Sequence, residues 1–192
     1  MTITPIQQAL DADWDRLDPV LQRHYSATDN TDHGRLDIEY PGWMQWPLDL
    51  LHAIGALLNT RGRDLAARVD KTTTDGRQLW RRRIELGNGR QASFDSQWIA
   101  AGPGCIIEFV NPLLGLKMSV RADRGCLYYE GKSLILRIGP WLLPLPENLL
   151  GHTLIVEQPV DEERFQMDFT LTHPWLGQIY RYTGVFRTDT EY

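Results

Sequence analysis

Residues 77–100 read RQLWRRRIELGNGRQASFDSQWIA, and this stretch decides the fold class. On both sides of its central Gly-Asn-Gly, large apolar side chains recur at every second position, which is the period of a strand with one buried face. The connection is too short for a parallel crossover, which needs roughly a dozen residues or more. We therefore interpret the stretch as an antiparallel β-hairpin.

The same period of two continues on both sides of this hairpin. The predicted strands are 66–73, 77–86, 91–100, 104–110, 113–122, 125–131, 133–138, 152–158, 164–172 and 177–187. Most connections are short and rich in Gly, Asp, Asn and Pro, which is typical of hairpin turns. The longest, from Gly139 to Gly151, is rich in Pro and Leu and is expected to cross an open end or edge of the sheet. About ten short antiparallel strands at this spacing predict a β-barrel or a strongly curved sheet.

Residues 1–62 are predicted to form a helical segment that precedes the strands. The expected elements are a helix over 20–25 capped by Asp18, a polar loop over 29–34, a short strand over 35–40 and a helix over 47–58. The fold class is therefore α+β but mainly β. We expect a single domain of residues 1–192, in which the antiparallel barrel or curved sheet spans 63–192.

The composition limits the classes of function. The net charge of −5 argues against a nucleic-acid-binding surface, which normally needs a basic field. The first residues carry acids where a signal peptide needs an apolar run, and the apolar stretch over 47–58 is too short to span a bilayer. We therefore expect a cytoplasmic protein that has no transmembrane segment and does not bind nucleic acid.

Two polar side chains fall on strand faces that are otherwise apolar. Arg82 alternates with Trp80 and Ile84, and Ser96 lies in a row with Phe94. The interior that these faces imply is large and aromatic with a few polar groups, which is the usual composition of a ligand pocket. The predicted ligand-binding residues are Trp80, Arg82, Phe94, Ser96, Trp98, Glu108, Met118, Tyr180 and Tyr182. The pattern leaves open which face of the last strand points inward.

Arg82 needs an explanation, because a charge on an apolar face must be paired or must serve a ligand. Glu108 is the best candidate for a partner, and Glu157 and Glu130 are weaker ones. A ligand carboxylate or phosphate is the second interpretation, since the guanidinium fork suits either group. The third is that the strand register differs and Arg82 is exposed.

The sequence carries no recognisable catalytic or cofactor motif. It has no dinucleotide-binding glycine motif after a strand, no phosphate-binding loop, no serine-hydrolase elbow and no zinc-protease motif. The five histidines are scattered, so no metal or cofactor is expected. His24 ends the first helical unit and is interpreted as a residue that interacts with the helix dipole, the alternative being an acid or base near a pocket mouth.

A series of short segments resembles a known family. The segments are Leu17–Tyr25, Trp80–Arg82, Phe94–Ser96, Gly125–Leu127, Leu143–Pro146 and His173–Gly184. In this order they are similar to the bacterial domain-of-unknown-function family numbered 4166. The positions that match its pattern are Arg23, His24, Tyr25, Trp80, Arg82, Ser96, Tyr180, Tyr182 and Gly184. The resemblance implies no catalytic role for them. In some members a dinucleotide-binding part precedes the domain, and a fused-oxidoreductase role is not expected for the sequence in hand.

Three functions from different classes are compatible with these observations. The leading hypothesis is that the barrel binds an apolar, lipid-like small molecule, whose head group could be acidic and held by Arg82. The alternative is an interaction or regulatory domain with a packed interior, in which Pro140–Leu150 contacts a partner or forms a homodimer. The third is an enzyme that uses Glu108, His24 or Tyr182 as acid or base, and it has the least support.

Overall fold

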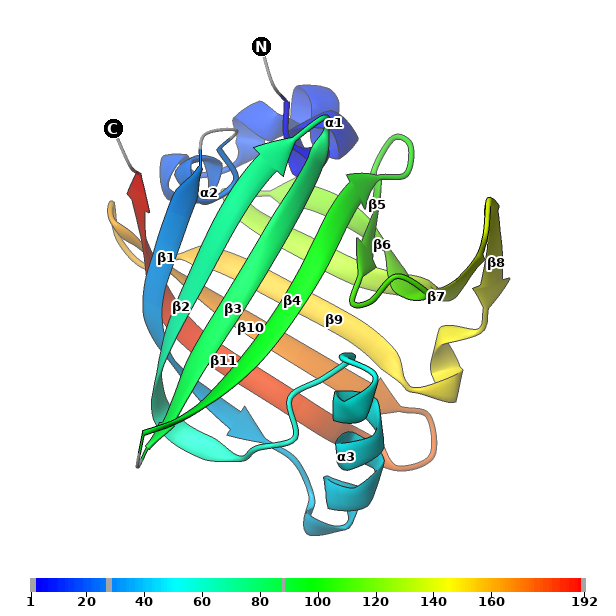
Figure 1. The fold of residues 1–192 in the computed structure, drawn as a ribbon. Coiled ribbons are helices and arrows are strands. Elements are labelled where there is room, and N and C mark those ends of the chain that lie inside the picture. Colours follow the sequence, from blue (N-terminus) through cyan, green and yellow to red (C-terminus); the bar gives the residue numbers. More distant parts are fainter. Residues whose placement is uncertain (1–2, 27–28, 88, 191–192) are drawn as a thin grey trace.

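The computed structural model describes residues 3–26, 29–87 and 89–190, and strands make up 61% of the fold against 17% helix. The described residues form a closed barrel of 10 antiparallel strands, with one extra strand outside it (Figure 1). The barrel strands are β1 Asn30–Glu39, β2 Gly62–Thr74, β3 Arg77–Gly87, β4 Arg90–Ala100, β5 Cys105–Phe109, β6 Leu114–Asp123, β7 Cys126–Ile138, β9 His152–Pro159, β10 Arg164–His173 and β11 Gly177–Thr190. The fold class predicted from the sequence is confirmed.

Pairing of the first and last strands closes the barrel. β1 pairs along its length with β2 on one side and with β11 on the other. Two glycines permit a close approach at this seam: a Cβ on Gly34 would lie 2.5 Å from the Val185 carbonyl oxygen, and one on Gly184 would lie 2.6 Å from the Arg35 carbonyl oxygen. The seam therefore accepts only the smallest side chain at these two positions, because backbone atoms cannot move aside cheaply.

Helices lie over the two ends of the barrel (Figure 1). At one end lie α1 Pro5–Leu10, η1 Asp11–Arg16 and α2 Pro19–His24, and at the other lie η2 Gly42–Met44 and α3 Gln45–Ala53. As predicted, Asp18 caps α2, because its Oδ1 accepts a hydrogen bond of 3.0 Å from the Val20 amide. Within the described part of the chain, no helix is long and apolar enough to cross a membrane.

Three local predictions were wrong. The polar stretch over 29–34 is not a loop: β1 begins at Asn30, because hydrogen bonding to strands on both sides outweighs its polar composition. Gly131-Lys132 is not a turn, and β7 continues to Ile138 with an irregularity in its pairing to β6. The helix predicted over 47–58 spans Gln45–Ala53 instead.

The long connection after Gly139 is partly a strand. β8 Trp141–Leu145 folds back on the second half of β7, and η3 Glu147–Leu149 follows it. In Figure 1 this hairpin extends away from the barrel wall. Asn88, in the predicted turn of the first hairpin, lies outside the described residues.

Candidate functional site

Arg82 points into the barrel from β3 and is paired there. Its Nη2 donates to Glu108 Oε1 at 3.0 Å and its Nη1 donates to Ser96 Oγ at 2.8 Å. The guanidinium carbon lies 4.8 Å from the ring centroid of Trp80 and 5.0 Å from that of Phe94. The predicted Arg82–Glu108 ion pair is therefore confirmed, with the guanidinium stacked between two aromatic walls.

A second polar network occupies the interior near the end covered by α2. Asp32 from β1 lies at its centre, with Oδ2 3.0 Å from His24 Nδ1 and 2.9 Å from Lys71 Nζ. Lys71 also donates to the carbonyl oxygen of His24, and Thr188 donates to Asp32 Oδ1 at 2.7 Å. Because these three ionisable side chains are almost wholly buried, each depends on the others rather than on water.

The network continues across the barrel to β9. Glu157 accepts hydrogen bonds from the Tyr25 hydroxyl at 2.9 Å to Oε1 and 2.7 Å to Oε2. The Tyr129 hydroxyl donates in turn to that of Tyr25. Glu157 Oε1 lies 3.9 Å from His24 Nε2, which is too long for a hydrogen bond.

Burial sets the charge state of these groups. Burial lowers the pKa of His24 to about 4 and raises the pKa of Glu157 to about 8. Burial alone would also raise the pKa of Asp32, but His24 and Lys71 outweigh it and hold that pKa low. At neutral pH the network therefore contains an ionised Asp32 paired with Lys71, together with a neutral His24 and a protonated Glu157.

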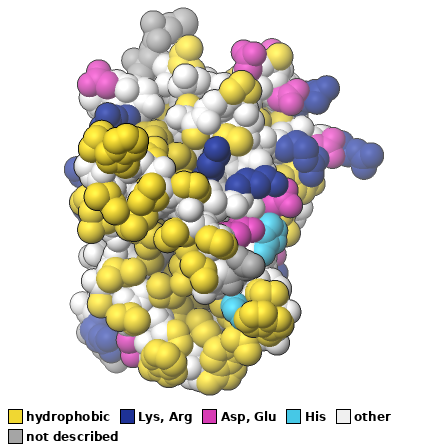
Figure 2. Space-filling view, turned by 90° about the vertical axis from the view of Figure 1, so that its right-hand side faces the viewer, with side chains coloured by type: hydrophobic (Ala, Val, Ile, Leu, Met, Phe, Trp, Pro, Cys, Tyr) yellow, Lys and Arg dark blue, Asp and Glu magenta, His cyan; other side chains and the backbone are white. Residues whose placement is uncertain are grey.

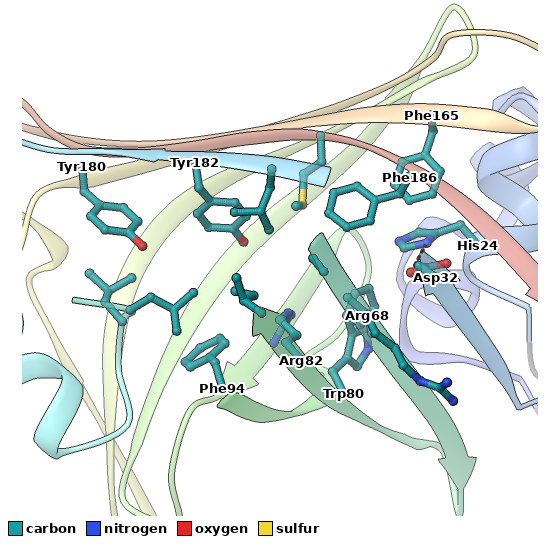
Figure 3. A pocket seen from close by; sticks show the side chains of 17 residues that line it. His24, Asp32, Arg68, Trp80, Arg82, Phe94, Phe165, Tyr180, Tyr182 and Phe186 are labelled. Atoms are coloured by element: carbon teal, nitrogen blue, oxygen red, sulfur yellow. Dashed lines mark ion pairs between the residues drawn. The ribbon is translucent and has the colours of Figure 1, made fainter. Parts of the chain in front are cut away.

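Two adjoining cavities remain inside the barrel, of about 50 Å³ and about 100 Å³. The residues that line both are Leu57, Trp80, Arg82, Phe94, Met167 and Tyr182. Figure 3 shows the smaller cavity, with Tyr180 and Tyr182 toward one end and His24 and Asp32 at the other. Arg82 thus lies where the two cavities meet.

Most of the predicted pocket residues are brought together by the fold. Trp80, Arg82, Phe94 and Tyr182 line both cavities. Tyr180 lines the smaller cavity, and Trp98 and Glu108 line the larger one. The face of β11 that carries the two tyrosines is therefore the inward face.

Two predicted residues line neither cavity. Ser96 lies behind Arg82 and accepts its hydrogen bond. Met118 is wholly buried in the hydrophobic core, on β6, against which α1 packs. Alternation along a strand identifies the inward face correctly, but it does not tell how deep in the barrel a side chain lies.

Sequence reasoning missed Asp32, Lys71, Tyr129 and the burial of His24. Lys71 continues the inward row of Ala67 and Val69 on β2, so the period of two could have found it. Asp32 was hidden in a stretch interpreted as a loop. His24 does end α2, as interpreted, but the sequence did not show that it is 2% exposed and contacts Asp32.

The residues proposed for acid–base chemistry do not form one constellation. Glu108 is bonded to Arg82, and His24 is bonded to Asp32. Among the residues that the structure describes, no hydrogen bond joins Glu108, His24 and Tyr182 to one another. The geometry therefore adds nothing to the interpretation as an enzyme.

Comparison with known proteins identifies a family but no activity. A family model described as "Domain of unknown function (DUF4166)" matches residues 17–186. No curated protein and no solved structure matches the chain.

Replacing Arg82 tests how far the barrel depends on its ion pair. Arg82→Met leaves the Glu108 carboxylate buried without a partner, so we expect the free energy of unfolding to fall by about 3–5 kcal/mol. The double variant Arg82→Met/Glu108→Gln should recover most of this loss, because neither charge remains. Urea unfolding measures the free energy of unfolding of both variants. If that free energy falls by less than about 1 kcal/mol in the single variant, the ion pair is dispensable.

The protonated Glu157 predicts a stability that depends on pH. Its pKa is about 8 in the folded protein against 4.5 normally, so its contribution falls as the pH rises toward 8. The lowered pKa of His24 acts in the opposite direction, but only below its ordinary value of 6.5. Between these limits, pH 6.5 and 8, we expect the free energy of unfolding to fall by about 1–2 kcal/mol. In urea unfolding, Glu157→Gln should remove most of this dependence of the free energy of unfolding on pH. An equal dependence in the variant and the unmodified protein would contradict a protonated Glu157.

Proposed function

The chain belongs to the DUF4166 family, whose description assigns no activity. From the geometry of the barrel interior, we propose that it binds a compact, largely apolar small molecule. The observation that carries this proposal is the pair of cavities that meet at Arg82. A closed barrel with a fully packed interior would have no such space. Ligand sites are typically apolar hollows with a few placed polar groups, and this interior has that composition.

The volumes favour a ligand of ring size. An apolar cavity of about 150 Å³ in another protein is large enough for benzene. The two cavities here, of about 50 and 100 Å³, are of the same order. A long acyl chain would exceed them, so the lipid-like ligand expected from the sequence becomes a short or cyclic one.

The charges favour a neutral ligand over an acid. The Arg82 guanidinium already neutralises Glu108, so a carboxylate placed beside it would compete for the same hydrogen bonds. The described residues engage one N–H from each of Nη1 and Nη2, and a guanidinium has five N–H donors, which leaves others for a ligand. These groups suit a carbonyl or hydroxyl oxygen at the junction of the cavities.

The segment after α3 is the proposed entrance. Ala56 and Leu57 of this segment contribute to the wall of the larger cavity, together with Leu51 of α3. It lies at the end of the barrel opposite α1 and α2 (Figure 1). Because α3 is short and has exposed apolar side chains such as Trp46 and Leu50, a small displacement of this segment would open the cavity.

A second candidate function rests on the surface around β8. Trp141 is 70% exposed, and Leu142, Leu143, Leu145 and Leu149 are exposed as well. Figure 2 shows the face of the molecule that carries this hairpin, and hydrophobic side chains cover much of it. Exposed apolar patches of this kind usually mark interaction sites. This surface supports the alternative of an interaction domain, with a homodimer through Pro140–Leu150 as its simplest form.

Binding of toluene tests the leading proposal. We expect toluene to give saturable NMR shift changes at residues of the barrel interior. Leu57→Trp places a larger side chain in the wall shared by both cavities and should weaken toluene binding by about tenfold or more. Leu50→Trp is the matched control, because Leu50 is 63% exposed on α3 and should leave binding unchanged. Absence of saturable binding to the unmodified protein would refute the proposal.

Light scattering over a range of protein concentrations tests the alternative. If β8 forms a homodimer, the unmodified protein should associate and Trp141→Ser should weaken that association by about tenfold or more, because a buried tryptophan is a typical hot spot. Trp175→Ser is the control, since Trp175 is also highly exposed, at 87%, but lies in the β10–β11 connection. A protein that stays monomeric at every concentration would exclude the dimer.

A further inference from the structure

We propose that His24 forms a hydroxyl-binding subsite inside the barrel, at the cavity end covered by α2, with Nε2 as the atom that hydrogen-bonds to the ligand. This inference rests on the proposed function and names the polar group that the ligand would carry. Four features of the described residues lead to it.

The first feature is that the His24 ring is held in one orientation. Its Nδ1 lies 3.0 Å from Asp32 Oδ2 and 2.9 Å from Lys71 Nζ, and Lys71 and Thr188 also hold that carboxylate. The carboxylate accepts and the lysine donates, so Nδ1 has a partner in either neutral tautomer of the ring. Nε2 is the ring nitrogen left for a ligand, as acceptor in one tautomer and as donor in the other.

The second feature is the burial of Nε2. Among the described residues, Nε2 of His24 has no hydrogen-bond partner, although it is shielded from solvent. The nearest carboxyl oxygen, Glu157 Oε1, is 3.9 Å away. Buried polar atoms are normally satisfied, so Nε2 calls for a hydrogen-bond partner from outside the chain.

The third feature is that a cavity reaches this residue. The smaller cavity is lined by His24 and Asp32 at one end and by mostly apolar side chains, such as Phe165 and Phe186, along its length. Figure 3 shows the His24 ring at that end of the cavity. A ligand in the cavity can therefore present a polar group to Nε2 without opening the polar network.

The fourth feature is the charge balance around the subsite. Asp32 is paired with Lys71 and Arg82 with Glu108, so no unbalanced charge is left to attract an ion. Burial keeps His24 uncharged, because it lowers the pKa of the ring to about 4. Burial likewise raises the pKa of Glu157 to about 8, so its carboxyl carries a proton at neutral pH.

These features select a hydroxyl among the common polar groups. A hydroxyl can donate to Nε2 or accept from it, so it fits either tautomer of His24. A carboxylate would lie near the Asp32 carboxylate. An ammonium group would introduce an unpaired charge into an apolar hollow. The ligand class is therefore a compact apolar ring or chain that carries one alcohol or phenol hydroxyl.

Phenol and toluene provide the test, because they have nearly the same shape and differ by a hydroxyl against a methyl group. His24→Asn is the informative variant, since the asparagine amide can replace Nδ1 beside Asp32 but offers nothing at the position of Nε2. We expect it to weaken phenol binding about tenfold while toluene affinity changes about twofold or less. Tyr180→Phe tests the competing position, because among the described residues the Tyr180 hydroxyl is also buried without a hydrogen-bond partner and lines the same cavity. If His24 holds the ligand hydroxyl, Tyr180→Phe should weaken phenol binding less than His24→Asn does.

The ¹⁵N resonance of His24 Nε2 gives a second readout on the unmodified protein. This resonance should shift on addition of phenol but not of toluene. If His24→Asn does not fold, the shift alone tests whether the hydroxyl of phenol binds at His24. If both probes bind and neither the His24→Asn affinity nor this resonance distinguishes them, the subsite is refuted while the proposed function stands. A loss of phenol affinity in Tyr180→Phe alone would place the hydroxyl at Tyr180 and also refute it. If neither probe binds, the proposed function fails and the subsite fails with it.

Discussion

Closure of the sheet between β1 and β11 is the constraint from which the other features of this structure follow. It encloses the inward side chains of all the barrel strands in one interior, including the charged ones on β1, β2, β3, β5 and β9. Charges in such a space must pair, because burying them bare is costly. The structure meets this requirement with two separate pairs, Asp32 with Lys71 and Arg82 with Glu108. The interior is thus polar at fixed points and neutral as a whole.

The two pairs divide the interior into regions with different roles. The Arg82 pair lies at the junction of the cavities, between the rings of Trp80 and Phe94. The Asp32 pair lies at the end covered by α2 and orients His24. Side chains that are locked by such networks keep the surrounding space in one shape, which favours selective binding of a small molecule over loose accommodation of many.

The site was partly predictable from sequence, and the residues that were missed show why. Arg82, Ser96 and Glu108 lie on strands with regular alternation, so their faces and their contact could be inferred from the period of two. Asp32 lies in a run of polar residues whose composition is typical of a loop. Its strand exists because β2 and β11 flank it, and these lie far along the chain. Local composition cannot report such a long-range contribution.

The sequence by itself determined the mainly β class, the antiparallel connections, the inward faces of the strands before the last one, and Glu108 as the best candidate partner of Arg82. These depend on local periodicity, turn length and the cost of a bare buried charge. Only the tertiary structure decided that the sheet closes, that His24, Asp32, Lys71 and Glu157 meet, and that two cavities remain. The reason is that depth along the barrel and the space left between side chains depend on strand register and on packing across the whole barrel, which no local pattern encodes.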